Sequence, residues 1–111
     1  MKKIKLVVVK TVDGKAFTTQ DGDKTREATI VDLIKGLIFA LPRETLTMED
    51  SIRARNLLTQ LTKTLDDIVP IEEAEHDWIK TKVSEFGPRT FGVNAVMVRD
   101  ALDNFERAKE K

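Results

Sequence analysis

The segment between Thr29 and Pro42 constrains the fold most, because it joins clear helix-end signals to an almost continuous apolar face. Thr29 and Asp32 have the spacing of a capping box, in which each side chain bonds the other residue's backbone N–H. Pro42 ends the helix. The apolar residues surround the helix on more than one side: Ile30, Val31, Leu33, Ile34, Leu37, Ile38 and Leu41. We therefore expect this helix at the centre of the core, with Gly36 permitting close approach of another element.

The chain before this helix has the residue pattern of β structure. The β-branched run 4–9 predicts a strand, and the Asp-Gly turn at 13–14 predicts a hairpin whose return strand is 16–19. A second Asp-Gly turn follows at 21–22, and 24–27 forms either a third short strand or a connection. An N-terminal β-hairpin is therefore expected.

Helical signals dominate the rest of the chain. A second helix opens at the Thr47 cap and is expected to run to about Leu65. A short extended link leads to a third helix, whose first turn is acidic and which stops at Gly87-Pro88. Asn94 is the expected N-cap of a fourth helix.

These elements describe an α+β fold of about four helices behind a hairpin. We expect a single domain over 1–111, with a β-rich hairpin region at 1–28 and a helical region at 29–111. The charged end 107–111 is expected to fray. The apolar start of the chain is interrupted by Lys5 and lacks a cleavage site, and no stretch is long enough to span a bilayer. A cytoplasmic protein without a membrane role is expected.

Several kinds of chemistry are excluded or disfavoured by residue content. The chain has no cysteine and one histidine, His76, so thiolate chemistry is excluded and a histidine-assisted serine nucleophile is disfavoured. Glu72 and Glu73 precede His76 at helical spacing, but no second histidine completes a strong metal site. We interpret His76 as an exposed residue in an acidic first turn. No catalytic residue, metal or cofactor is expected, and the chain is not expected to be an enzyme.

Nucleic-acid binding remains the alternative to a protein-binding role. The 19 basic residues are balanced by 19 acidic ones, so the total shows no excess for phosphate contacts. Arg53 and Arg55 on the second helix offer one local basic face, and a second is formed by Lys80, Lys82, Arg89 and Arg99.

The stretch 86–94 is the least ordinary part of the sequence, because two aromatics, two glycines and a proline fall within nine residues. If Phe91 is exposed it is an anchor for a partner, and if buried it closes the core under the last turn. Burial is favoured. The candidate partner-binding residues are Phe91, as an anchor if it is exposed, together with Arg89, Arg53 and Arg55.

The order of features resembles that of small uncharacterised proteins of tailed bacteriophages and prophages. The residues that carry the resemblance are the lysine-rich first strand 2–9, the Asp-Gly-Lys turn at 13–15, the second Asp-Gly turn at 21–23, and the apolar helix from Ile30. The resemblance implies an accessory, assembly or regulatory role and assigns no catalytic residue.

Together these observations predict a non-enzymatic protein-interaction or assembly protein that binds a protein partner and self-associates. The surplus apolar surface of the helix from Ile30 is the reason to expect a homo-oligomer.

Overall fold

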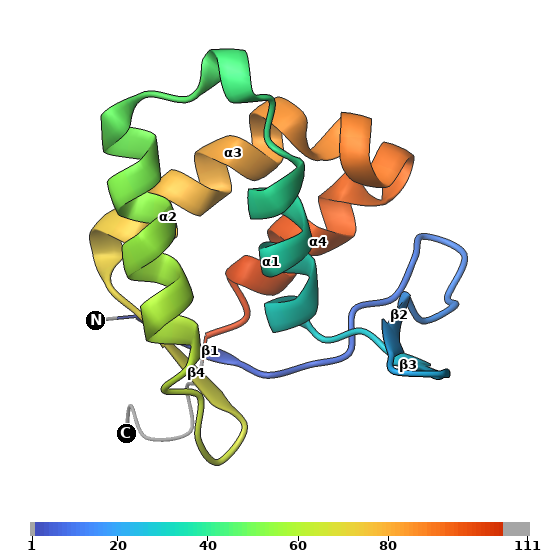
Figure 1. Cartoon of the computed structure of the whole chain (residues 1–111). Helices are drawn as coiled ribbons and strands as arrows, with labels where there is room; N and C mark the ends of the chain where they lie inside the picture. Colours follow the sequence, from blue (N-terminus) through green and yellow to red (C-terminus); the bar gives the residue numbers. More distant parts are fainter. Residues whose placement is uncertain (1, 106–111) are drawn as a thin grey trace.

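The computed structural model of the chain describes residues 2–105. The strands are β1 (Lys2–Lys5), β2 (Thr18–Asp21), β3 (Lys24–Glu27) and β4 (Ile68–Ile71). The helices are α1 (Ile30–Ala40), α2 (Met48–Leu61), α3 (Glu73–Phe91) and α4 (Ala95–Leu102), with short 3-10 helices η1 (Arg43–Thr45) and η2 (Gly92–Asn94) (Figure 1). The expected α+β class is confirmed. The predicted fraying of 107–111 lies outside the described residues.

The predicted pairing of the first strand with 16–19 is wrong in its main part. β1 pairs antiparallel with β4, which places Ile4 opposite Val69. Ile4, Val69 and Ile71 are fully buried there, and burial of apolar side chains favours this distant pairing over the nearer one. The Asp-Gly turn still reverses the chain, because Lys10 lies opposite Ala16 in an isolated bridge.

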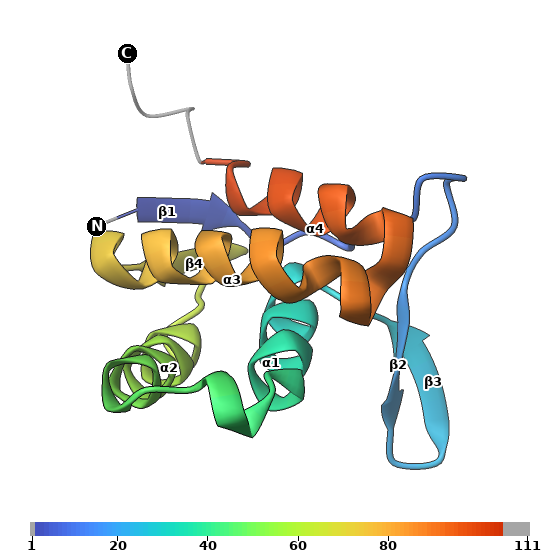
Figure 2. The ribbon, with the colours of Figure 1, turned by 90° about the horizontal axis from the view of Figure 1, so that it is seen from above.

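The regular hairpin is the one around the second Asp-Gly turn. β2 pairs antiparallel with β3, from Thr18 opposite Glu27 to Asp21 opposite Lys24. Both views show this hairpin standing apart from the helices (Figures 1 and 2). The residues of β3 are all exposed, so the hairpin depends on local pairing and on its attachment to α1. That attachment is the two-bond contact of the Arg26 guanidinium with the Asp32 carboxylate, at 2.8 and 2.9 Å.

The first helix lies at the centre of the core, as predicted. α1 contacts α2, α3 and α4. Its buried residues are Ile30, Leu33, Ile34, Leu37 and Ile38. The Asp32 carboxylate accepts the Thr29 backbone N–H at 2.8 Å, so the N-terminal cap forms as the sequence predicts. The domain covers most of the predicted apolar face by itself.

The second helix begins at its predicted cap but ends earlier than expected. Thr47 Oγ1 accepts the Asp50 N–H at 3.1 Å, and the Asp50 carboxylate accepts the Thr47 N–H at 3.0 Å. α2 ends at Leu61, and a tight turn follows in which Leu65 and Ile68 exchange backbone hydrogen bonds of 3.0 Å. This turn directs the chain into β4, and Leu65, the expected last residue of this helix, lies outside it and is exposed.

The third helix continues through the predicted stop at Gly87-Pro88. Gly87 packs against α4, where a Cβ would stand 3.1 Å from the Ala95 Cβ. Pro88 removes only one helical bond, and Ser84, whose carbonyl it leaves free, is exposed and open to solvent. α3 ends instead at Gly92, which has a φ of 62°. The residues between the predicted stop and the predicted Asn94 cap therefore form the last turn of α3 and η2.

Asn94 does not cap α4 through its side chain. Its Oδ1 accepts the Val12 backbone N–H at 2.9 Å, which ties the Asp-Gly loop to the start of α4. The predicted close approach at Gly36 is also wrong, because nothing outside α1 lies within 4 Å of where its Cβ would stand.

Two glycine substitutions should change stability in opposite directions. Gly92→Ala should lower the free energy of unfolding by about 1–3 kcal/mol, because alanine is strained at this positive φ. Gly36→Ala should raise it by up to about 1 kcal/mol, because Gly36 lies within a helix with open space beside it. Urea denaturation of both variants measures the two changes, and equal effects would contradict the described end of α3.

Among the described residues, no helix combines the length and the apolar character needed to cross a membrane.

Candidate functional site

An open apolar groove runs between α1 and α2, with one exposed aromatic residue at its edge. The groove has a volume of about 550 Å³. Its lining residues are Ile38, Phe39, Ser51, Ala54, Arg55, Leu58, Thr59 and Thr62. Phe39, in the last turn of α1, leaves 76% of its surface exposed, although its neighbour Ile38 is buried. We call this surface the α1–α2 groove.

The spacing of residues on α2 forms one wall of this groove. Ser51, Ala54, Leu58 and Thr62 follow one another at three or four residues and so share a helix face. Ala54 is short, which leaves room between the two helices. The Thr59 hydroxyl donates to the Arg55 carbonyl at 3.1 Å, so its hydrogen-bonding demand is met within α2. The wall therefore presents mostly apolar surface to solvent.

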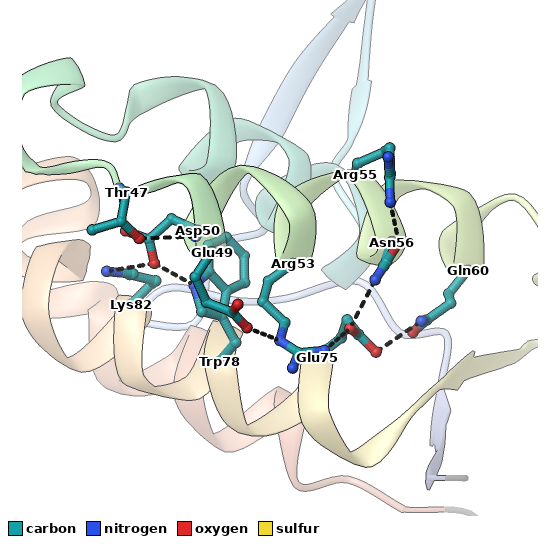
Figure 3. A network of polar contacts seen from close by, with 10 residues as sticks. All are labelled: Thr47, Glu49, Asp50, Arg53, Arg55, Asn56, Gln60, Glu75, Trp78 and Lys82. Atoms are coloured by element: carbon teal, nitrogen blue, oxygen red, sulfur yellow. Dashed lines mark hydrogen bonds and ion pairs between the residues drawn. The ribbon is translucent and has the colours of Figure 1, made fainter.

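On another face of α2, a buried carboxylate joins this helix to α3. Glu75 is 3% exposed and accepts hydrogen bonds from Arg53 at 2.8 Å, Gln60 at 2.9 Å and Asn56 at 3.4 Å (Figure 3). Burial by itself raises the pKa of the Glu75 carboxyl, but these three donors reverse the effect and hold that pKa below its ordinary value. Arg53 also contacts Glu49 at 2.9 Å.

A second set of polar contacts fastens the start of α2 to α3. The Asp50 carboxylate accepts the Trp78 indole N–H at 3.0 Å, and the Lys82 ammonium lies 3.6 Å away (Figure 3). The indole hydrogen bond, together with the Thr47 N–H, holds the pKa of Asp50 below its ordinary value. These contacts hold α2 in place from its α3 side and leave the α1–α2 groove open to solvent.

The structure separates the four candidate partner-binding residues predicted from the sequence. The Arg53 guanidinium is engaged by Glu49 and Glu75, which makes it a structural residue. Arg55 is exposed and lines the α1–α2 groove. Of the two arginines proposed as a basic face for nucleic acid, one is thus already neutralised.

The other two candidates lie in the last turn of α3. Arg89 is exposed, and its guanidinium stands 5.9 Å from the centre of the Phe86 ring. Phe91 is half-buried and packs edge-to-face against Phe17, with 6.0 Å between ring centres. The interpretation of Phe91 as a residue that closes the core fits this position.

The interpretation of His76 as an exposed residue is wrong. The side chain is 1% exposed, and its Nε2 lies 2.7 Å from the Leu102 carbonyl oxygen. α3 begins at Glu73, so that His76 faces α4 while Glu72 and Glu73 remain exposed. The imidazole stacks at a tilt on Phe105, with ring centres 5.4 Å apart. Within 2–105, no three His, Cys, Asp or Glu residues are grouped as metal ligands would be.

Phe39 is the exposed groove residue that the sequence reasoning missed. The apolar face of α1 was assigned to the residues at core spacing, and Phe39 falls outside that set. The available signal was a large aromatic four residues after the charged Lys35 and so on the polar side of an otherwise buried helix.

Comparison with protein-family models, with curated proteins and with solved structures found no match to this chain.

Proposed function

We propose that this chain is a non-enzymatic protein-interaction protein that self-associates through the α1–α2 groove. The observation that carries the proposal is Phe39, a large aromatic side chain left 76% exposed at the edge of an apolar groove. The resemblance noted in the sequence supports an accessory or assembly role in a tailed phage or prophage.

The occupant we propose for the groove is a second copy of the chain. A two-fold symmetric interface brings the same patch of two copies together, so the patch must be complementary to itself. The α1–α2 groove meets this condition, because it combines a protruding ring with a hollow lined by small and apolar side chains. In the dimer, Phe39 of each copy enters the groove of the other, and burial of each ring contributes about 1.5–3 kcal/mol.

Charge does not oppose this pairing. The chain carries 19 basic and 19 acidic residues, so two copies experience no net long-range repulsion. Arg55 is the charged residue of the groove lining, and its long apolar stem can cover the ring of an incoming phenylalanine.

The oligomeric state of Phe39→Asp tests the proposal. We expect the unmodified chain to form a dimer whose population rises with concentration in sedimentation equilibrium. Phe39→Asp should weaken the dimer at least about tenfold, because it removes the buried ring and places a carboxylate in an apolar hollow.

Val93→Asp is the matched control. Val93 is 78% exposed in η2 and is outside the α1–α2 groove, so its replacement adds the same charge and removes an exposed apolar side chain at another place. The control should sediment like the unmodified chain, and both variants should keep their melting temperature. A strictly monomeric unmodified chain, or equal weakening by both variants, would refute self-association through this groove.

A further inference from the structure

The extended segment that follows β1 is bonded along one edge by backbone groups of three residues from two other parts of the chain. Val7 accepts the Ile30 N–H at 2.9 Å, and Val9 both donates to Ala28 at 3.3 Å and accepts from Phe17 at 3.1 Å. In an extended chain, alternate residues direct their backbone groups to opposite edges. The odd-numbered residues therefore use the edge that faces Ala28 and Phe17.

The even-numbered residues Val8 and Lys10 have their backbone groups on the other edge. Val8 lies opposite Thr29 and Lys10 opposite Ala16 in isolated antiparallel bridges. The hydrogen bonds of both bridges are made by the residues on either side of Val8 and Lys10, and not by these two residues themselves. Both are therefore non-hydrogen-bonded pairs, and the N–H and C=O of Val8 and Lys10 point away from Thr29 and Ala16. No backbone group within 2–105 bonds to them, and Val8 is 36% exposed. We call this the Val8–Lys10 edge.

A groove of about 510 Å³ lies between this segment and α4. One wall consists of Val7, Val8, Val9 and Lys10, and the other of Met97, Asp100, Ala101 and Asn104. Figure 2 shows α4 lying over the segment that continues from β1. Successive side chains of an extended segment point to opposite faces, so a groove on one face would be lined by alternate residues only. This groove is lined by four consecutive residues, and it therefore runs along the edge of the segment. The unpaired backbone groups of Val8 and Lys10 thus border a groove closed on its far side by a helix.

We infer that this groove binds an extended peptide segment of another protein, which adds a strand to the Val8–Lys10 edge. A strand presents one N–H and one C=O to a given edge at every second residue, and this is the spacing of Val8 and Lys10. Main-chain pairing supplies affinity in this mode, and pockets for alternate side chains supply specificity. This surface shares no lining residue with the α1–α2 groove, so the inference goes beyond self-association.

The lining defines the chemistry of the peptide. Met97 and Ala101 are half-buried and receive an apolar side chain, and the thioether of Met97 adapts to its shape. The Asp100 carboxylate is exposed on the α4 wall and the Lys10 ammonium on the opposite wall. A complementary peptide alternates apolar residues and carries a basic residue toward Asp100 and an acidic residue toward Lys10.

A library of random seven-residue peptides displayed on a carrier, selected on the full chain, is the probe for this site. The selected peptides should alternate apolar residues and include the two charges. Each is then synthesised with and without N-methyl groups on the backbone nitrogens at alternate positions. Methylation of the donors that face the edge should weaken binding at least about tenfold, because it removes hydrogen bonds and leaves side chains intact. Bound peptide should also slow hydrogen exchange of the Val8 and Lys10 amides.

Two substitutions at one position separate backbone pairing from side-chain charge. Lys10→Pro removes the free N–H and should weaken the peptide about tenfold, whereas Lys10→Ala keeps it and should weaken the peptide less than about threefold. The Lys10 N–H bonds to nothing in the described chain, so the proline variant should fold. The comparison of N-methylated with unmethylated peptides tests backbone pairing without relying on this variant. Phe39→Asp should leave peptide binding unchanged, which separates this site from self-association.

Three outcomes would overturn the inference: no peptide is enriched, the N-methylated peptides bind as well as their parents, or Lys10→Ala matches Lys10→Pro. Dissociation of a dimer by Lys10→Pro, without peptide selection, would assign this edge to a second copy of the chain and would also overturn it.

Discussion

Replacing Glu75 by alanine should lower the free energy of unfolding by about 3 kcal/mol, the lower end of the cost of removing one partner from a buried ion pair. The variant leaves the donors of Arg53, Asn56 and Gln60 facing a cavity between α2 and α3. Arg53 retains Glu49 at 2.9 Å, which is the reason for the lower figure. Urea denaturation at neutral pH measures the loss.

Glu49→Ala is the matched control, since Glu49 contacts the same guanidinium but lies largely exposed. Exposed ion pairs contribute about 0–1 kcal/mol, so this variant should remain close to the unmodified chain. Equal losses for the two variants would show that Glu75 is not buried in the α2–α3 contact.

The same carboxylate should make stability depend on pH in the acid range. The folded state holds the pKa of Glu75 below its ordinary value of 4.5, so its contribution is fully present above about pH 4.5. That contribution is lost as the pH falls toward the lower pKa of the folded state, because the unfolded chain binds the proton first. Glu75→Gln should therefore flatten this acid slope. Asp32 and Asp50, whose pKa values are also lowered, should leave a residual slope.

Replacing Ile4 by alanine should cost about 2–5 kcal/mol, as expected for a truncated residue in a packed core. Ile4 is 0% exposed and pairs with Val69, so its side chain joins the start of the chain to a strand more than sixty residues later. The midpoint of thermal unfolding should fall by at least about 8 °C, given that 1 kcal/mol shifts a domain of this size by about 4–8 °C.

Val8→Ala is the control on the same extended segment. Val8 is 36% exposed, and the substitution should cost less than about 1 kcal/mol. If residues 4–9 formed one regular strand of the hairpin predicted from the sequence, Ile4 and Val8 would lie on the same face of that strand. Their replacement by alanine would then lower the free energy of unfolding by similar amounts. A large difference is the result that the β1–β4 pairing requires, and similar costs would count against it.

Local signals in the sequence were sufficient for the starts of α1 and α2, whereas the predicted Asn94 cap of α4 did not form. The capping boxes at Thr29 and Thr47 form where they were predicted, because both partners lie within four residues of each other. Pro42 ended α1 for the same local reason. Gly87-Pro88 failed as a stop, because the contact of Gly87 with Ala95 stabilises a continued helix and no local rule includes that contact.

The candidate sites were less accessible to sequence reasoning than the fold. Arg55 was named, but Phe39 was not, because its exposure follows from how α2 packs beside α1. The Val8–Lys10 edge was also missed, since the sequence places these residues inside a hairpin. His76 was assigned to the wrong side of its helix, because the facing depends on the position of α4.

The sequence alone determined the α+β class, the starts of α1 and α2 and the central place of α1, since these follow from spacing and capping within a few residues. The tertiary structure decided which strand pairs with β1, which cations are already neutralised and which apolar residues remain exposed. Those outcomes depend on which distant segments pack against each other. The burial of apolar surface that favours one packing over another involves residues far apart in the sequence, so local patterns do not show it.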